Sequence, residues 1–60
     1  MNRLTDAQRD CIEHFETIAR ETGATIEWIT DDDGASLRIL ETLDGETLVW
    51  HVSAEGVAYL

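Results

Sequence analysis

The sequence predicts an α+β fold in which one helix packs on an antiparallel sheet. In the first third of the 60-residue chain, apolar residues recur with the period of a helix. The remainder alternates apolar and polar residues and is interrupted by turn-forming aspartate and glycine residues. A hydrophobic content of 43% is typical of a folded globular protein. We therefore expect residues 1–60 to form one small domain.

The helix is expected at about residues 6–22. Thr5 and Gln8 have the spacing of a capping box, and Asp6 follows in the first turn, where the helix dipole favours a negative charge. Gly23 suits a left-handed cap at the C-terminal end. The apolar stripe expected to face the sheet comprises Leu4, Ala7, Cys11, Phe15, Ile18 and Thr22, with Ile12 and Ala19 beside it.

Three strands and a possible short fourth are expected to form a meander. Their expected bounds are 25–30, 36–42, 46–52 and 57–60. The turns between them are expected at 31–34, 44–45 and 53–56. Asp44-Gly45 is the strongest hairpin signal of the chain.

The turn lengths predict how the strands pair. A two-residue turn at 44–45 places Ile39 opposite Trp50, and a four-residue turn at 31–34 places Trp28 opposite Leu37. Both pairings place one apolar set on the face toward the helix: Ile26, Trp28, Leu37, Ile39, Leu48, Trp50 and Val52. The other face is expected to carry Glu27, Arg38 and His51 in one row, with Ile29, Leu40 and Val49 nearby. The expected core joins Phe15, Trp28, Ile39 and Trp50.

Charge is the most informative feature for function. The chain has 13 acidic residues, four arginines and no lysine, which gives a formal net charge of -9. A field of this sign repels nucleic acid and anionic membranes and attracts basic clefts of other proteins. No secretory signal or transmembrane segment is visible, and a single cysteine fits a reducing cytoplasm.

The sequence does not favour a metal site or a catalytic site. The run Asp31-Asp32-Asp33-Gly34 lacks the alternating ligands of a calcium loop and fits an acidic turn. Zinc needs three or four convergent ligands, whereas Cys11 and His14 stand apart from His51. Asp10 and Glu13 beside Cys11 are expected to raise its pKa, which disfavours a nucleophilic thiol. We therefore expect no metal, no cofactor and no enzymatic activity.

The acidic residues permit two interpretations. Asp6, Asp10 and Glu13 form one column along the helix, which favours a docking face. Oppositely charged pairs at Arg9–Glu13 and Glu16–Arg20 favour a merely solvated face. For the whole surface, the alternatives are adaptation to high salt and mimicry of nucleic acid.

In length, charge and architecture the chain resembles the small acidic anti-CRISPR proteins of phages, in particular type I-C inhibitors built from one amphipathic helix and an antiparallel meander. The resemblance covers helix Thr5–Thr22, the strands and the acids throughout. It implies a DNA mimic in the host cytoplasm that occupies the basic DNA-binding surface of the surveillance complex. Candidate contacts are Asp6, Asp10, Glu13, Asp31, Asp32 and Asp33.

A protein of this kind is expected to bind neither nucleic acid nor membrane directly and to be a monomer or weak homodimer. The alternative is an acidic housekeeping or dimerising interaction domain of a halophilic organism. Such a domain could associate through a sheet edge or through the patch of Ile29, Leu40 and Val49.

Overall fold

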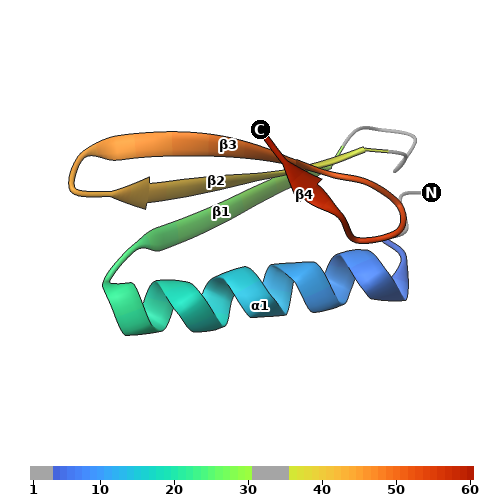
Figure 1. The fold of residues 1–60 in the computed structure, drawn as a ribbon, viewed down its shortest axis with the longest axis horizontal. Helices are drawn as coiled ribbons and strands as arrows, with labels where there is room; N and C mark the ends of the chain where they lie inside the picture. Colours follow the sequence, from blue (N-terminus) through green and yellow to red (C-terminus); the bar gives the residue numbers. More distant parts are fainter. Residues whose placement is uncertain (1–3, 31–35) are drawn as a thin grey trace.

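One helix lies along one face of a four-stranded antiparallel sheet (Figure 1). The structure is a computed structural model that describes residues 4–30 and 36–60. Its elements are α1 (Asp6–Thr22), β1 (Thr25–Thr30), β2 (Leu37–Leu43), β3 (Glu46–Val52) and β4 (Ala58–Tyr59). The strands are neighbours in the sheet in the order of the sequence. The predicted α+β meander is confirmed, and the fourth strand is shorter than predicted.

Both ends of α1 are capped as predicted. The Gln8 N–H donates to the Thr5 hydroxyl at 3.1 Å, and the Thr5 N–H donates to Gln8 Oε1 at 3.0 Å. Gly23 has a φ of 85° and its N–H donates to the carbonyl of Ala19 at 2.8 Å. These bonds satisfy backbone groups that a helix end otherwise leaves without partners.

The buried side of α1 is rotated relative to the predicted stripe. Its buried residues are Gln8, Ile12 and Ala19, whereas Ile18 is exposed. The predicted stripe contains apolar residues and so leaves out Gln8, which is polar but buried. The capping bond with Thr5 satisfies the Gln8 side-chain oxygen, so this residue can be buried at little cost.

The β2–β3 hairpin has the predicted pairing, in which Ile39 lies opposite Trp50 and Glu41 opposite Leu48. Asp44 and Gly45 both have positive φ, 54° and 81°, as a two-residue hairpin turn requires. Strand β2 extends one residue beyond the predicted end because Leu43 pairs with Glu46.

The predicted pairing of β1 with β2 is wrong by two residues. Trp28 lies opposite Ile39 rather than Leu37, and Leu37 lies opposite Thr30. Six residues, 31–36, therefore connect these strands instead of four. A shift of two preserves the face of every side chain, because side chains alternate with a period of two.

The shift changes the rows on the outer face of the sheet. Ile29, and not Glu27, lies in line with Arg38 and His51, while Glu27 lies opposite Leu40. The predicted row of Glu27, Arg38 and His51 is therefore wrong, although its members share the outer face.

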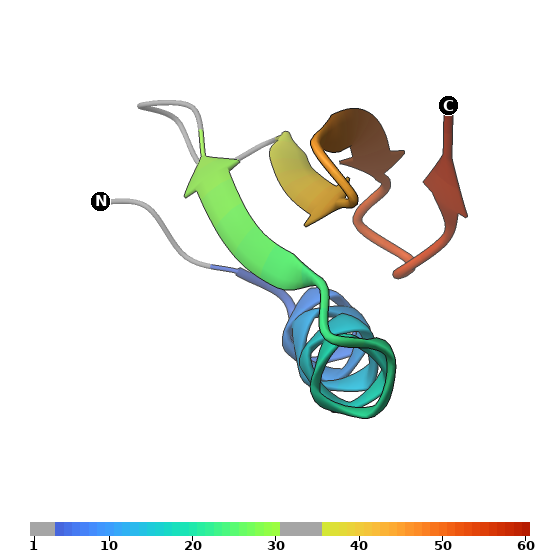
Figure 2. The same cartoon turned by 90° about the vertical axis from the view of Figure 1, so that its left-hand side faces the viewer.

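The core lies between α1 and the first three strands. Ile12, Leu37, Ile39 and Val52 are buried, and a partly buried shell packs against them: Leu4, Cys11, Phe15, Ile26, Trp50 and Ala58. The Phe15 and Trp50 rings are 5.6 Å apart, as the predicted shared core requires. Trp28 does not join them, because it lies on the edge strand β1 and remains 47% exposed (Figure 2).

Candidate functional site

The first candidate site is the outer side of α1, which is acidic. Asp6, Asp10 and Glu13 are all exposed, and at about 100° per residue they lie opposite the buried Ile12 and Ala19. Along the helix axis they are roughly 6 Å and 4.5 Å apart. We call these three residues the outer acidic face. Glu21, which is also exposed, continues it about three turns beyond Asp10.

The outer acidic face is carried on an anchored helix. Besides its capping bonds, the Thr5 hydroxyl donates to the carbonyl of Ala54 at 2.7 Å, which ties the helix start to the β3–β4 turn. A Cβ atom added to Gly56 would lie 2.7 Å from the Ala7 carbonyl oxygen, so this turn touches the helix backbone. The helix backbone that carries these carboxylates is therefore anchored to the sheet at its first turn.

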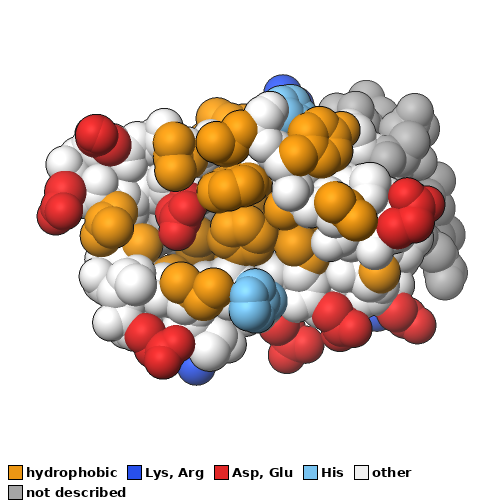
Figure 3. Space-filling view, in the orientation of Figure 1, with side chains coloured by type: hydrophobic (Ala, Val, Ile, Leu, Met, Phe, Trp, Pro, Cys, Tyr) orange, Lys and Arg blue, Asp and Glu red, His pale blue; other side chains and the backbone are white. Residues whose placement is uncertain are grey.

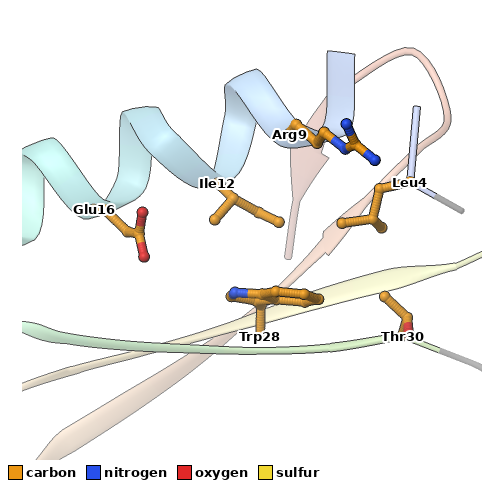
Figure 4. A pocket seen from close by; sticks show the side chains of 6 residues that line it. All are labelled: Leu4, Arg9, Ile12, Glu16, Trp28 and Thr30. Carbon is orange, nitrogen blue, oxygen red and sulfur yellow. The ribbon is translucent and has the colours of Figure 1, made fainter. Parts of the chain in front are cut away.

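The arginines of α1 lie on the flank of the helix that faces β1. Arg9 and Glu16 line a pocket of about 520 Å³ between α1 and β1, with Leu4, Ile12, Trp28 and Thr30. Figure 4 shows the Trp28 ring below Ile12, with Arg9 and Leu4 at one end of the pocket and Glu16 at the other. Arg20 lines a second hollow on the same flank, beside Ile26. The positive charges of the helix are thus on its flank toward β1, where Arg9 borders the acidic column because it is i+3 from Asp6 and i−4 from Glu13.

A second acidic group lies at the β2–β3 hairpin. A pocket of about 360 Å³ is lined by two leucines and three carboxylates: Glu41, Leu43, Asp44, Glu46 and Leu48. The sequence analysis did not single out this group. The available signal was Glu41, a charged residue on the otherwise apolar face of the predicted strand.

The remaining predicted contacts, Asp31, Asp32 and Asp33, lie outside the described residues. The structure therefore places Asp6, Asp10 and Glu13 together and leaves the predicted docking role of the 31–33 turn as a prediction.

The cysteine and histidine residues form no ligand set in the described part of the chain. Within residues 4–30 and 36–60, no group of three or more His, Cys, Asp and Glu residues could hold a metal ion. His51 stacks on Tyr59 on the outer face of the sheet, with ring centroids 5.7 Å apart. Burial raises the pKa of the Cys11 thiol, so the predicted direction is confirmed while the cause is desolvation rather than the neighbouring acids.

The patch predicted on the outer face of the sheet is partly exposed. Ile29 and Val49 are exposed and Leu40 is half-buried. Leu40 lies directly opposite Val49, whereas Ile29 is in the next row. This face lies opposite the one that packs on α1.

Comparisons with known proteins identify no relative. No protein-family model matches the chain, and no significant similarity is found among curated proteins or solved structures. No helix in the described residues is both long and apolar enough to cross a bilayer. The resemblance to small acidic inhibitors thus remains an expectation from length, charge and architecture.

Proposed function

We propose that this protein is an acidic inhibitor that mimics the charge of nucleic acid and blocks DNA binding by a CRISPR surveillance complex. The observation that carries the proposal is the outer acidic face: Asp6, Asp10 and Glu13 are exposed on one side of an anchored helix, opposite its buried side. Duplex DNA carries one negative charge per about 1.7 Å of its axis. A mimic needs carboxylates on a fixed scaffold, and this face supplies three at roughly 4.5–6 Å along the axis, which is wider than the roughly 3.4 Å rise between phosphates of one DNA strand.

The mechanism is competition. Carboxylates of the outer acidic face pair with Lys and Arg side chains of the complex that otherwise hold phosphates. The net charge of -9 accelerates the encounter, and added salt slows it. The protein itself does not bind DNA, acts in the host cytoplasm as a monomer or weak homodimer, and uses no cofactor.

The test is displacement of target DNA from purified surveillance complexes, beginning with type I-C complexes. We expect saturating inhibitor to abolish DNA binding and the effect to weaken as salt rises. Retention of full DNA binding by every complex at saturation contradicts the proposal.

Charge-neutral variants locate the contact. Each exposed ion pair contributes only about 0.2–1 kcal/mol, so a cluster must be changed together. The variant D6N/D10N/E13Q is expected to lose inhibition. The matched control E16Q/E27Q/D44N removes the same number of charges from exposed positions elsewhere and should still inhibit. Equal loss in both variants indicates that total charge, and not this face, determines binding.

A second function fits one further observation. Exposed acids also occur outside the helix, at Asp44, Glu46 and Glu55, and the chain has no lysine. This distribution suits a domain of a halophilic organism, whose acidity maintains solubility. Such a domain is expected to unfold at low salt because carboxylate repulsion is unscreened. Circular dichroism between about 0.05 and 3 M salt separates the two functions, because only the halophilic domain should unfold at the low end. Over this range the screening length falls from about 14 to about 2 Å.

A further inference from the structure

The single helix covers only half of the inner face of the sheet. Helix α1 packs mainly against β1 and β2, and Figure 2 shows β4 lying to one side of it. A helix is about 10 Å wide and neighbouring strands are about 4.8 Å apart, so one helix covers roughly two strands. On this face Ile39 of β2 and Val52 of β3 are buried, whereas Leu43 of β2 and Leu48 of β3, toward the hairpin, are 40% and 46% exposed.

The uncovered part is an apolar surface that adjoins the pocket at the hairpin (Figure 3), and we call it the β3 groove. It is defined by Phe15, Ile18, Leu43, Leu48 and Trp50. Phe15 and Trp50 are in contact at its base, and Ile18 lies one helical turn beyond Phe15 on the same side of α1. Figure 3 shows apolar side chains gathered between the helix and β3.

The two ends of the β3 groove differ. Near the start of α1 it is closed by the β3–β4 turn, where the Thr5 hydroxyl bonds to the carbonyl of Ala54. At the β2–β3 hairpin it opens into the pocket formed by Leu43, Leu48 and the carboxylates of Glu41, Asp44 and Glu46. The mouth of the groove is therefore negatively charged.

Glu41 indicates the chemistry of the occupant. It lies on the inner face opposite Leu48, half-buried, and Trp50 Nε1 donates to its Oε1 at 3.1 Å. A purely apolar occupant would remove water from this carboxylate without replacing the lost hydrogen bonds, which is costly. An occupant with an Arg or Lys side chain at this position supplies them.

A second copy of the chain does not satisfy this requirement. Placed symmetrically in the groove, it would bring its own Glu41, Asp44 and Glu46 toward the same carboxylates. Like charges in a desolvated interface are repulsive.

We propose that the β3 groove binds a basic amphipathic helix of a partner protein. Its apolar side chains cover Leu48 and Trp50 beside α1, and its Arg or Lys side chains meet Glu41, Asp44 and Glu46. The occupant takes the place of a second helix on the sheet. This inference does not depend on the proposed function, because the groove is separate from the outer acidic face and the partner need not bind nucleic acid.

The probe is a synthetic helical peptide of about 17 residues, the length of α1, with Leu on one face and Arg on the other. One control peptide has the same composition in scrambled order, and another has Glu in place of Arg. Binding is followed by NMR through the two indole N–H signals. We expect the Arg peptide to shift the Trp50 signal, which reports the Glu41 bond, more than the Trp28 signal. The two control peptides should bind at least about tenfold more weakly.

Adjacent residues of β3 provide the matched variants. Leu48 is 46% exposed in the groove and Val49 is 42% exposed on the opposite face, so both substitutions to Ser should leave the fold intact. Leu48→Ser is expected to weaken peptide binding about tenfold, and Val49→Ser less than about twofold. Glu46→Gln should weaken it more than Glu27→Gln, which changes the outer face.

Three results overturn the proposal. The first is equal binding of the Arg and scrambled peptides, which indicates charge attraction alone. The second is equal behaviour of Leu48→Ser and Val49→Ser. The third is a concentration-dependent shift of the Trp50 signal without peptide that Leu48→Ser abolishes, which shows that a second copy fills the groove. Loss of peptide binding in these variants with intact DNA displacement leaves the proposed function untouched.

Discussion

The two halves of the inner sheet face have similar sequences and different surroundings. Strands β2 and β3 both place apolar residues at alternate positions, yet Ile39 is buried and Leu48 is about half exposed. The difference arises from the elements above the sheet, which cover Ile39 of β2 and Val52 of β3 and leave the hairpin end of both strands, Leu43 and Leu48, open. An apolar pattern therefore indicates which face of a strand turns inward, but the number of covering elements decides how much of that face is buried.

The largest expected effect contrasts these two halves directly. Ile39→Ala should destabilise the protein by about 2–5 kcal/mol, because it leaves a cavity in the covered half. Leu48→Ala in the open half should cost about 1 kcal/mol or less. Urea unfolding followed by circular dichroism measures both values. Similar losses would show that the open half is covered in solution.

The contact that closes the β3 groove can be tested with two glycines. Gly56 and Gly45 both have a φ of 81°, but only Gly56 lies against the helix, where a Cβ would be 2.7 Å from the Ala7 carbonyl oxygen. Gly45→Ala should cost about 1–2 kcal/mol from backbone strain alone. Gly56→Ala should cost about 1–3 kcal/mol more, because the turn must move from α1. If Gly45→Ala and Gly56→Ala unfold at the same urea concentration, the β3–β4 turn does not touch the helix.

The helix start is expected to contribute a smaller amount. Thr5→Ala removes the N-cap bond to Gln8 and the bond to Ala54, and should cost about 1–2 kcal/mol. Thr17→Ala is the control: its hydroxyl bonds only to the Glu13 carbonyl on an exposed part of α1. This substitution should change the free energy of unfolding by less than about 0.5 kcal/mol. A larger loss at Thr17 than at Thr5 would contradict the capping assignment.

The smallest effect concerns the Cys11 thiol, which packs against the core on α1. Because burial raises its pKa, the folded protein forms the reactive thiolate only at higher pH than the unfolded chain does. Alkylation by iodoacetamide should therefore begin at higher pH in the folded protein than in about 6–8 M urea. This urea concentration is about two to four times that at the midpoint of unfolding, so the chain is unfolded there. By the same linkage, stability should fall slightly as pH rises above the ordinary pKa of a thiol, because the unfolded state releases this proton first. If alkylation has the same pH profile in the folded and the unfolded protein, the Cys11 thiol is exposed to water.

Local signals in the sequence were sufficient for the secondary structure. The Thr5–Gln8 box, Gly23 and Asp44-Gly45 act through neighbouring residues, so the bounds of α1, β1 and β3 and the β2–β3 pairing follow from them. The β1–β2 pairing could not be predicted as securely. It depends on the length of a connection that no specific turn signal fixes, and a shift of two residues leaves the buried face unchanged.

The candidate sites divide in the same way. The column of Asp6, Asp10 and Glu13 follows from helical periodicity, because spacings of three and four residues share one face whatever the helix packs against. The positions of Arg9 and Arg20 on the β1 flank required the packing of α1, since the buried side centres on Gln8 and Ile12 rather than on the apolar stripe.

The sequence by itself determined the charge, the helix, the hairpin and the inward face of each strand, because these depend on composition and on contacts between near neighbours. Only the tertiary structure decided where the helix lies on the sheet. That placement buries Leu37 and Ile39, leaves Trp28 at an open edge and exposes Leu48 beside Glu41. The physical reason is that the alternation of apolar and polar residues specifies which face of a strand each side chain is on. Burial of that side chain depends on whether another element packs on that face.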